Sequence, residues 1–149
     1  MANENVNTSI SFLFRGLTAE QFALIDAQFK DNEELRVNTT LKIVKNDEAR
    51  MIGVYTKIDF LQNSTSAFII VEVSCHFEII KESWEKIFNP EEKTVTLPKD
   101  FATHLAMLTI GSTRGYLLGK IEKHPIYSKF FVPLVNVQDL VKGDVILKP

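Results

Sequence analysis

The sequence predicts a single α+β domain, with strands first and a long helix last. Alternating apolar and polar residues fill much of the first eighty positions, which is the pattern of strands with one buried face. After Pro98 the apolar residues become closely spaced, as in a helix. The chain has 149 residues, 45% hydrophobic and 24% charged, which fits one globular domain spanning residues 1–149.

The first strand is predicted to be short and to be followed by an irregular crossover. Ile10, Phe12 and Phe14 alternate with more polar positions, which indicates one apolar face. From Leu17 to Asn32 no strand or helix period is sustained. We therefore expect this stretch to cross over without regular structure.

Three long strands are predicted next, joined as a meander. Residues 35–43, 52–60 and 67–79 each alternate with period two, as strands with one solvated face do. Polar residues at 45–48 and 62–64 separate them, and their composition is typical of chain reversals.

Two features place the main helix. Residues 81–88 indicate a short amphipathic turn that ends at Asn89, because a residue before proline disfavours helix, and a polar link follows. Pro98 suits the first turn of a helix, and Asp100 is favourable beside its positive N-terminal end. The main helix is expected to begin there.

This helix is apolar on most of its circumference, so we expect it to be covered on two sides by self-association. Gly111, Gly115 and Gly119 recur at every fourth position, which indicates either close approach of another backbone or a frayed helix end. The predicted oligomer interface comprises Leu105, Met107, Gly111 and Gly115. Near the C-terminus, Asn136 is the predicted N-cap of a short helix that ends at Gly143.

Composition argues against several classes of protein. The formal charge is −2, without basic clusters interleaved with aromatic residues, so nucleic acid is an improbable partner. Apolar runs such as 67–71 are far shorter than the roughly 18 residues that span a bilayer, so membrane insertion is not expected. Residues 1–10 lack the pattern of a secretory signal, and the single cysteine, Cys75, is predicted to be a buried thiol. We expect a cytoplasmic protein.

No motif points to catalysis. His76, His104 and His124 lack the paired spacings of zinc sites, and residues 111–115 lack the spacing of a phosphate-binding loop. Cys75 is expected to face inward, which favours an inert thiol over a nucleophile. The chain is therefore predicted to be neither an enzyme nor a protein that needs a metal or cofactor.

Large aromatic residues are numerous in segments that should lie on the surface. Gathered together, such residues bind extended peptides, although some could instead close the edges of the core. The residues concerned are Phe22, Phe29, Trp84, Phe88, Tyr127, Phe130 and Phe131.

The order of elements and several short motifs resemble the SecB family of bacterial export chaperones. Thr113-Arg114-Gly115 is similar to the Ser-Arg-Gly near the end of that family's long helix. The stretch 133–136, Pro-Leu-Val-Asn, is similar to the segment before its second helix, and 136–140 continues the match. Phe77-Glu78-Ile79 is similar to the end of its fourth strand.

The resemblance implies a SecB-like four-stranded antiparallel sheet packed on one long C-terminal helix, with a second short helix. It also implies a homo-oligomer, a dimer or dimer of dimers, with long helices between two sheets. Unfolded polypeptide would bind between the crossover and the second helix. The matching positions are Phe22, Phe29, Val137 and Leu140.

Two hypotheses of function follow. The first is an ATP-independent chaperone that holds unfolded or extended polypeptides, serving export or a toxin–antitoxin client. Coupling to the SecA motor is expected to be weak, because the sheet's polar face mixes both charges and the sequence reaches Pro149 soon after the short helix. The alternative is a protein that binds a small apolar ligand, for which an enclosed cavity is expected.

Overall fold

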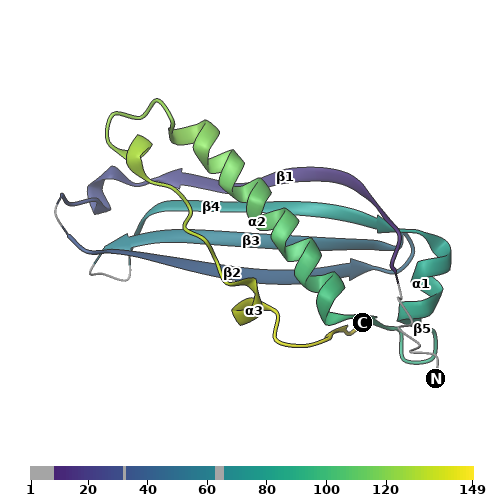
Figure 1. The fold of residues 1–149 in the computed structure, drawn as a ribbon. Coiled ribbons are helices and arrows are strands. Elements are labelled where there is room, and N and C mark those ends of the chain that lie inside the picture. Colours follow the sequence, from purple (N-terminus) through teal and green to yellow (C-terminus); the bar gives the residue numbers. More distant parts are fainter. Residues whose placement is uncertain (1–8, 32, 63–65) are drawn as a thin grey trace, which may run out of the picture.

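A four-stranded antiparallel sheet with one long helix across it forms the body of the protein (Figure 1). The computed structural model describes residues 9–31, 33–62 and 66–149. The strands lie in the order β1-β4-β3-β2. Their bounds, with those of the helix, are β1 Phe12–Leu24, β2 Leu35–Asn46, β3 Met51–Gln62, β4 Ala67–Ile79 and α2 Lys99–Ile121. The predicted α+β class, with strands first and the long helix last, is confirmed.

Shorter elements flank this body, and they include a second sheet that was not predicted. The polar link expected after Asn89 contains a strand, because Val95 and Leu97 alternate with threonines and are fully buried. It pairs with strands on both sides, in the order β5-β6-β7. The elements are η1 Asp26–Gln28, α1 Lys81–Ile87, β5 Phe88–Asn89, β6 Thr94–Leu97, η2 Tyr127–Lys129, α3 Val137–Leu140 and β7 Val145–Leu147.

Strand β1 is far longer than predicted, and the expectation of an irregular crossover from Leu17 is wrong up to Leu24. Register shifts against β4 occur between Phe14 and Gly16 and between Ala19 and Gln21. Each bulge adds one residue and reverses the alternation of faces, so no single period runs through the segment. This explains why the pattern was not recognisable as a strand.

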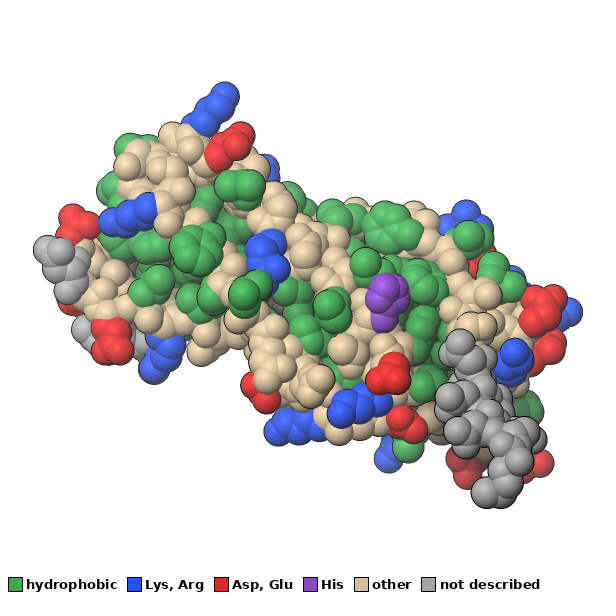
Figure 2. Space-filling view, in the orientation of Figure 1, with side chains coloured by type: hydrophobic (Ala, Val, Ile, Leu, Met, Phe, Trp, Pro, Cys, Tyr) green, Lys and Arg blue, Asp and Glu red, His purple; other side chains and the backbone are tan. Residues whose placement is uncertain are grey.

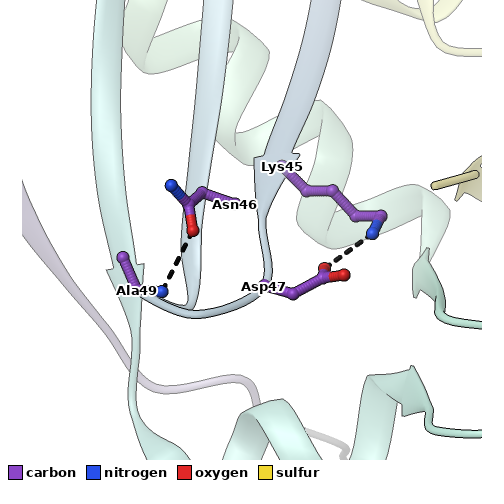
Figure 3. Close-up of polar contacts among 4 residues, drawn as sticks. All are labelled: Lys45, Asn46, Asp47 and Ala49. Carbon is purple, nitrogen blue, oxygen red and sulfur yellow. Dashed lines mark hydrogen bonds and ion pairs between the residues drawn. The ribbon is translucent and has the colours of Figure 1, made fainter.

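The hairpin between β2 and β3 is confirmed, and Figure 3 shows its turn. The Asn46 side chain accepts a hydrogen bond of 3.1 Å from the backbone N–H of Ala49. Lys45 Nζ lies 2.6 Å from Asp47 Oδ1, although the lysine side chain is only 7% exposed. Arg50 closes the turn with a positive φ of 52°. The second predicted reversal includes Asn63 and Ser64, which lie outside the described residues.

Helix α2 packs on the sheet through two core clusters. Leu105 and Ala106 belong to the first, with Ile52 and Phe77. Leu117 and Ile121, about three helix turns or more further along, belong to the second. The helix continues to Ile121 through Gly111, Gly115 and Gly119, so these glycines do not mark a frayed end.

After α2 the chain turns back and crosses the same side of the sheet to reach α3 (Figure 1). The predicted N-cap is confirmed, because Asn136 Oδ1 accepts from the N–H of Gln138 at 3.2 Å. Helix α3 ends at Leu140, earlier than the predicted Gly143. Cys75 is buried in the first cluster, as predicted.

Candidate functional site

Exposed apolar side chains gather on the side of the molecule that carries α2. Figure 2 shows hydrophobic side chains spread over this side, with most charged groups toward its margins. Two of these side chains lie in the coil of residues 130–136, which follows α2 and η2, where Phe131 is 73% and Leu134 is 93% exposed. Large exposed apolar side chains that gather in one place are typical of interaction sites. Three others lie on the helix itself, Met107, Leu108 and Leu118.

Arg114 of α2 holds the coil in place. Its Nε donates to the carbonyl of Val132 at 3.2 Å, and its Nη2 donates to the carbonyl of Pro133 at 2.9 Å. Hydrogen bonds from a charged donor are stronger than those between neutral groups. Phe131 and Leu134, on either side of the two bonded carbonyls, therefore project from a backbone that is fixed to the helix.

Two open grooves lie on the two sides of this coil. The first has a volume of about 360 Å³ and separates the coil from α2, and the second, of about 290 Å³, separates it from the start of β2. Phe130 and Phe131 line both. The first is also lined by Gly111, Arg114, Gly115, Leu117, Leu118 and Val132, and the second by Leu35, Val37, Lys129 and Pro133.

The loop between α2 and the coil is anchored to the crossover by a buried tyrosine. Tyr127 donates its hydroxyl hydrogen to Asp26 Oδ1 at 2.7 Å. Burial raises the pKa of Tyr127 to about 12, and the hydrogen bond to Asp26 and the charge of its carboxylate act in the same direction. His124 stacks on the ring with 4.2 Å between centroids.

Phe29 fastens the crossover to the same loop. Its ring centroid lies 5.0 Å from that of Phe68, 5.4 Å from Tyr127 and 5.9 Å from Phe130. Next to it, the Gln62 side chain accepts from the N–H of Lys30 and donates to its carbonyl, both at 2.8 Å. Phe29 thus supports the wall of the grooves from behind.

The four residues predicted to bind polypeptide lie in different parts of the molecule. Phe22 and Phe29 are half-buried against the second core cluster, whereas Val137 is half-buried against the first, and Leu140 is half-buried in α3. Phe22 lies 6.0 Å from the Tyr116 ring. Phe22 lies in β1 and Phe29 in the crossover, and the placement of both favours the alternative that the two rings close the edge of the core. Direct contact of the four residues with a client stays a prediction.

The residues predicted to form an oligomer interface lie on two sides of α2. Met107, Gly111 and Gly115 are exposed, and an added Cβ at either glycine would meet no atom within 4 Å in the described residues. Leu105 is 0% exposed and packs in its own chain's core, so it has no free surface for a second copy. Its expected place at an interface is therefore corrected.

Sequence reasoning singled out Phe131 only as one of several surplus aromatics, and it missed Leu118 and Leu134. Arg114 was quoted for its motif but not for its role in fixing the coil. The available signal was the combination of an arginine on the main helix and apolar residues on both sides of Pro133. A contact between residues 18 or 19 positions apart is not visible in a local pattern.

One polar cluster has the residue types of a catalytic site but not the proton arrangement. Ser74 donates its hydroxyl hydrogen to Glu20 Oε1 at 2.6 Å and lies 3.0 Å from His76 Nε2. Because the one hydroxyl hydrogen goes to glutamate, the histidine must donate to the serine and does not act as its base. Ser74 is also fully buried.

Metal-ligand clusters and membrane-spanning helices are both absent from the described residues. Nowhere in residues 9–31, 33–62 and 66–149 do three His, Cys, Asp or Glu side chains gather as metal ligands. No helix in the same ranges combines the length and apolarity needed to cross a bilayer.

Comparison with known proteins gives distant structural likenesses only. No protein-family model and no curated protein matches the sequence. A SecB-like chaperone of Mycobacterium tuberculosis, in complex with a ChAD peptide from the HigA1 antitoxin, is 12% identical with a TM-score of 0.47, over 84% of this chain and 91% of that chain. A Streptococcus agalactiae protein of unknown function is 14% identical with a TM-score of 0.39, over 85% and 98%. At these values neither likeness assigns the chain to a family.

Proposed function

We propose that the protein is a SecB-like, ATP-independent chaperone that holds unfolded or extended polypeptides. The observation that carries this proposal is the coil of residues 130–136, whose exposed Phe131 lines an open apolar groove on each side. Leu134, three residues further along the coil, is exposed as well. A soluble protein gains nothing in stability by exposing these side chains, so their position suits a client that covers them.

An extended polypeptide fits this arrangement better than a folded partner does. Its side chains point alternately to opposite sides, so neighbouring residues can enter the two grooves while the backbone passes over the coil. Covering one large apolar side chain contributes about 1.5 to 3 kcal/mol, which corresponds to roughly tenfold or more in affinity. Phe131 and Leu134 together can therefore supply much of the binding free energy.

The sequence resemblance supports the same conclusion. Its two most specific motifs contain Arg114, Gly115 and Pro133, all of which line a groove. We propose that self-association uses the other exposed half of α2, at Met107 and Leu108. The client, whether an export or a toxin–antitoxin protein, and weak coupling to SecA stay predictions, as does a cytoplasmic location.

Binding of a small apolar ligand remains the second candidate. The volume of the first groove, about 360 Å³, falls in the range of small-molecule sites. The groove is open to solvent, however, whereas tight small-molecule sites enclose most of the ligand. A panel of fluorescent apolar probes distinguishes the two, because a ligand-binding protein should prefer one compound and exclude unfolded clients.

The test uses a permanently unfolded client and calorimetric titration. Phe131→Ala combined with Leu134→Ala should weaken binding by at least about tenfold without changing thermal unfolding, because both residues are exposed. The matched control is Ile146→Ala, which also removes an exposed apolar side chain, on β7. Equal affinities for wild type, double variant and control would overturn the proposed site.

A further inference from the structure

The surroundings of the two grooves are basic, although the chain as a whole is slightly acidic. Residues 110–135 hold four of the chain's seventeen basic residues and only one of its nineteen acidic residues, Glu122. The basic residues are Arg114, Lys120, Lys123 and Lys129. Arg114 lines the first groove, Lys129 lines the second, and no acidic residue lines either. The apolar surface thus lies in a locally positive field.

These lysines are free to meet an incoming carboxylate. In the described part of the chain, none of Lys120, Lys123 and Lys129 is ion-paired, and all three are exposed. Lys129 Nζ lies 5.5 Å from the centroid of Phe130, and Lys120 Nζ lies 5.5 Å from that of Tyr116. The first contact holds the Lys129 ammonium beside Phe130 in the groove walls, whereas the second holds Lys120 against a ring of α2 that lines neither groove. Both leave the other faces of the ammonium groups in water.

Acidic residues do occur nearby, since Glu122 follows α2 and Asp26 accepts from the Tyr127 hydroxyl, but neither lines a groove. Glu33 and Glu34 precede Leu35 in the chain, but neither lines the second groove. At physiological ionic strength, charges act over roughly 8 Å, so the groups that line a groove dominate the potential inside it. For a bound segment that potential comes from Arg114 and Lys129.

We propose that the site selects apolar polypeptide segments flanked by aspartate or glutamate. This selectivity rests on the proposed function and adds the class of segment that binds. Apolar side chains of the segment enter the grooves on both sides of Phe131. Its flanking carboxylates approach Lys129 and, at the end of α2, Lys120 and Lys123. Basic segments of equal hydrophobicity meet like charges and bind more weakly.

Three peptides with one apolar core, flanked by Asp, Ser or Lys, test the proposal by fluorescence anisotropy with the full chain. The acidic peptide should bind roughly threefold to tenfold more tightly than the serine peptide, because each exposed ion pair contributes little alone. The lysine peptide should be weaker than the serine peptide. Raising the salt concentration should bring the three affinities together.

Charge reversal at Lys129 provides the specific readout. Lys129→Glu should reduce or invert the preference for acidic over basic flanks. The control, Lys81→Glu, makes the same change on α1, at the opposite end of the sheet from the C-terminal end of α2, and should keep the wild-type ratio (Figure 1). Equal binding of all three peptides, or a ratio unaffected by Lys129→Glu, overturns the selectivity alone. Failure of the serine peptide to bind at any salt concentration overturns the proposed function itself.

Discussion

Replacing Phe29 by alanine should lower stability far more than replacing Phe131, although Phe29 contacts the groove residue Phe130 and Phe131 lines both grooves. The Phe29 ring touches three other rings, at centroid distances from 5.0 to 5.9 Å, and is half-buried. Burial of this kind gives about 3 to 5 kcal/mol for Phe→Ala at a fully buried site, so about 2 to 4 kcal/mol is expected here. Phe131 is 73% exposed, and its truncation should change stability by about 0.5 kcal/mol or less.

The assay is urea and thermal unfolding of both single variants, followed by titration with the unfolded client. For a chain of this size, about 2 to 4 kcal/mol corresponds to a fall in Tm of roughly 5 to 15 °C. The affinity of Phe29→Ala for the client should be measured under conditions well below the unfolding transition of this variant, where the residues that line the grooves are still folded. Phe131→Ala should show the opposite pattern, with normal unfolding and weak binding.

The refuting result is specific. If Phe29→Ala unfolds like the wild type and loses about tenfold in client affinity, then Phe29 contacts the client directly. The binding site would then lie at the crossover, as the sequence resemblance implies, and Phe29 would not act as a support for the groove wall.

Three further predictions concern other contacts. The free energy of unfolding should fall as the pH rises from about 10 to about 12, because an unfolded tyrosine ionises near 10 while Tyr127 keeps its proton until about 12. Urea titrations at each pH measure this fall, and Tyr127→Phe should remove it. Arg114→Gln should speed amide exchange in residues 131–135, since two hydrogen bonds to the coil are lost, while exchange in β3 stays slow. Light scattering at micromolar concentration should give a mass above that of the monomer, which Met107→Lys lowers and Ile146→Lys does not.

Much of the sheet was predictable because three of its strands keep a clear period over most of their length. Residues 35–43 of β2, 52–60 of β3 and 67–79 of β4 alternate in sequence, and Pro98 marks the start of α2. Strand β1 was not predictable beyond Phe14, because its two bulges reverse the alternation. Strands β6 and β7 contain only 4 and 3 residues, too few to distinguish a strand from a loop.

The sequence predicted the type of binding surface but not the residues that form it. An excess of aromatic residues in loops indicated an apolar binding surface, but not which rings are exposed. Phe29 and Phe131 look alike in sequence, and their difference arises from the partners that each meets after folding. Phe29 faces the rings of Phe68 and Tyr127, whereas the bonds from Arg114 leave Phe131 pointing outward. Such pairings are set by tertiary packing rather than by local sequence.

Amide hydrogen exchange with and without a saturating unfolded client tests the central claim most directly. The coil of residues 130–136 belongs to no helix or strand, so covering it should slow exchange of its amides measurably. The account predicts that protection on binding is largest in this coil and at the start of β2, and that it is absent from β7. Protection confined to the opposite face of the sheet, or to residues 137–140 with the coil unchanged, would contradict it.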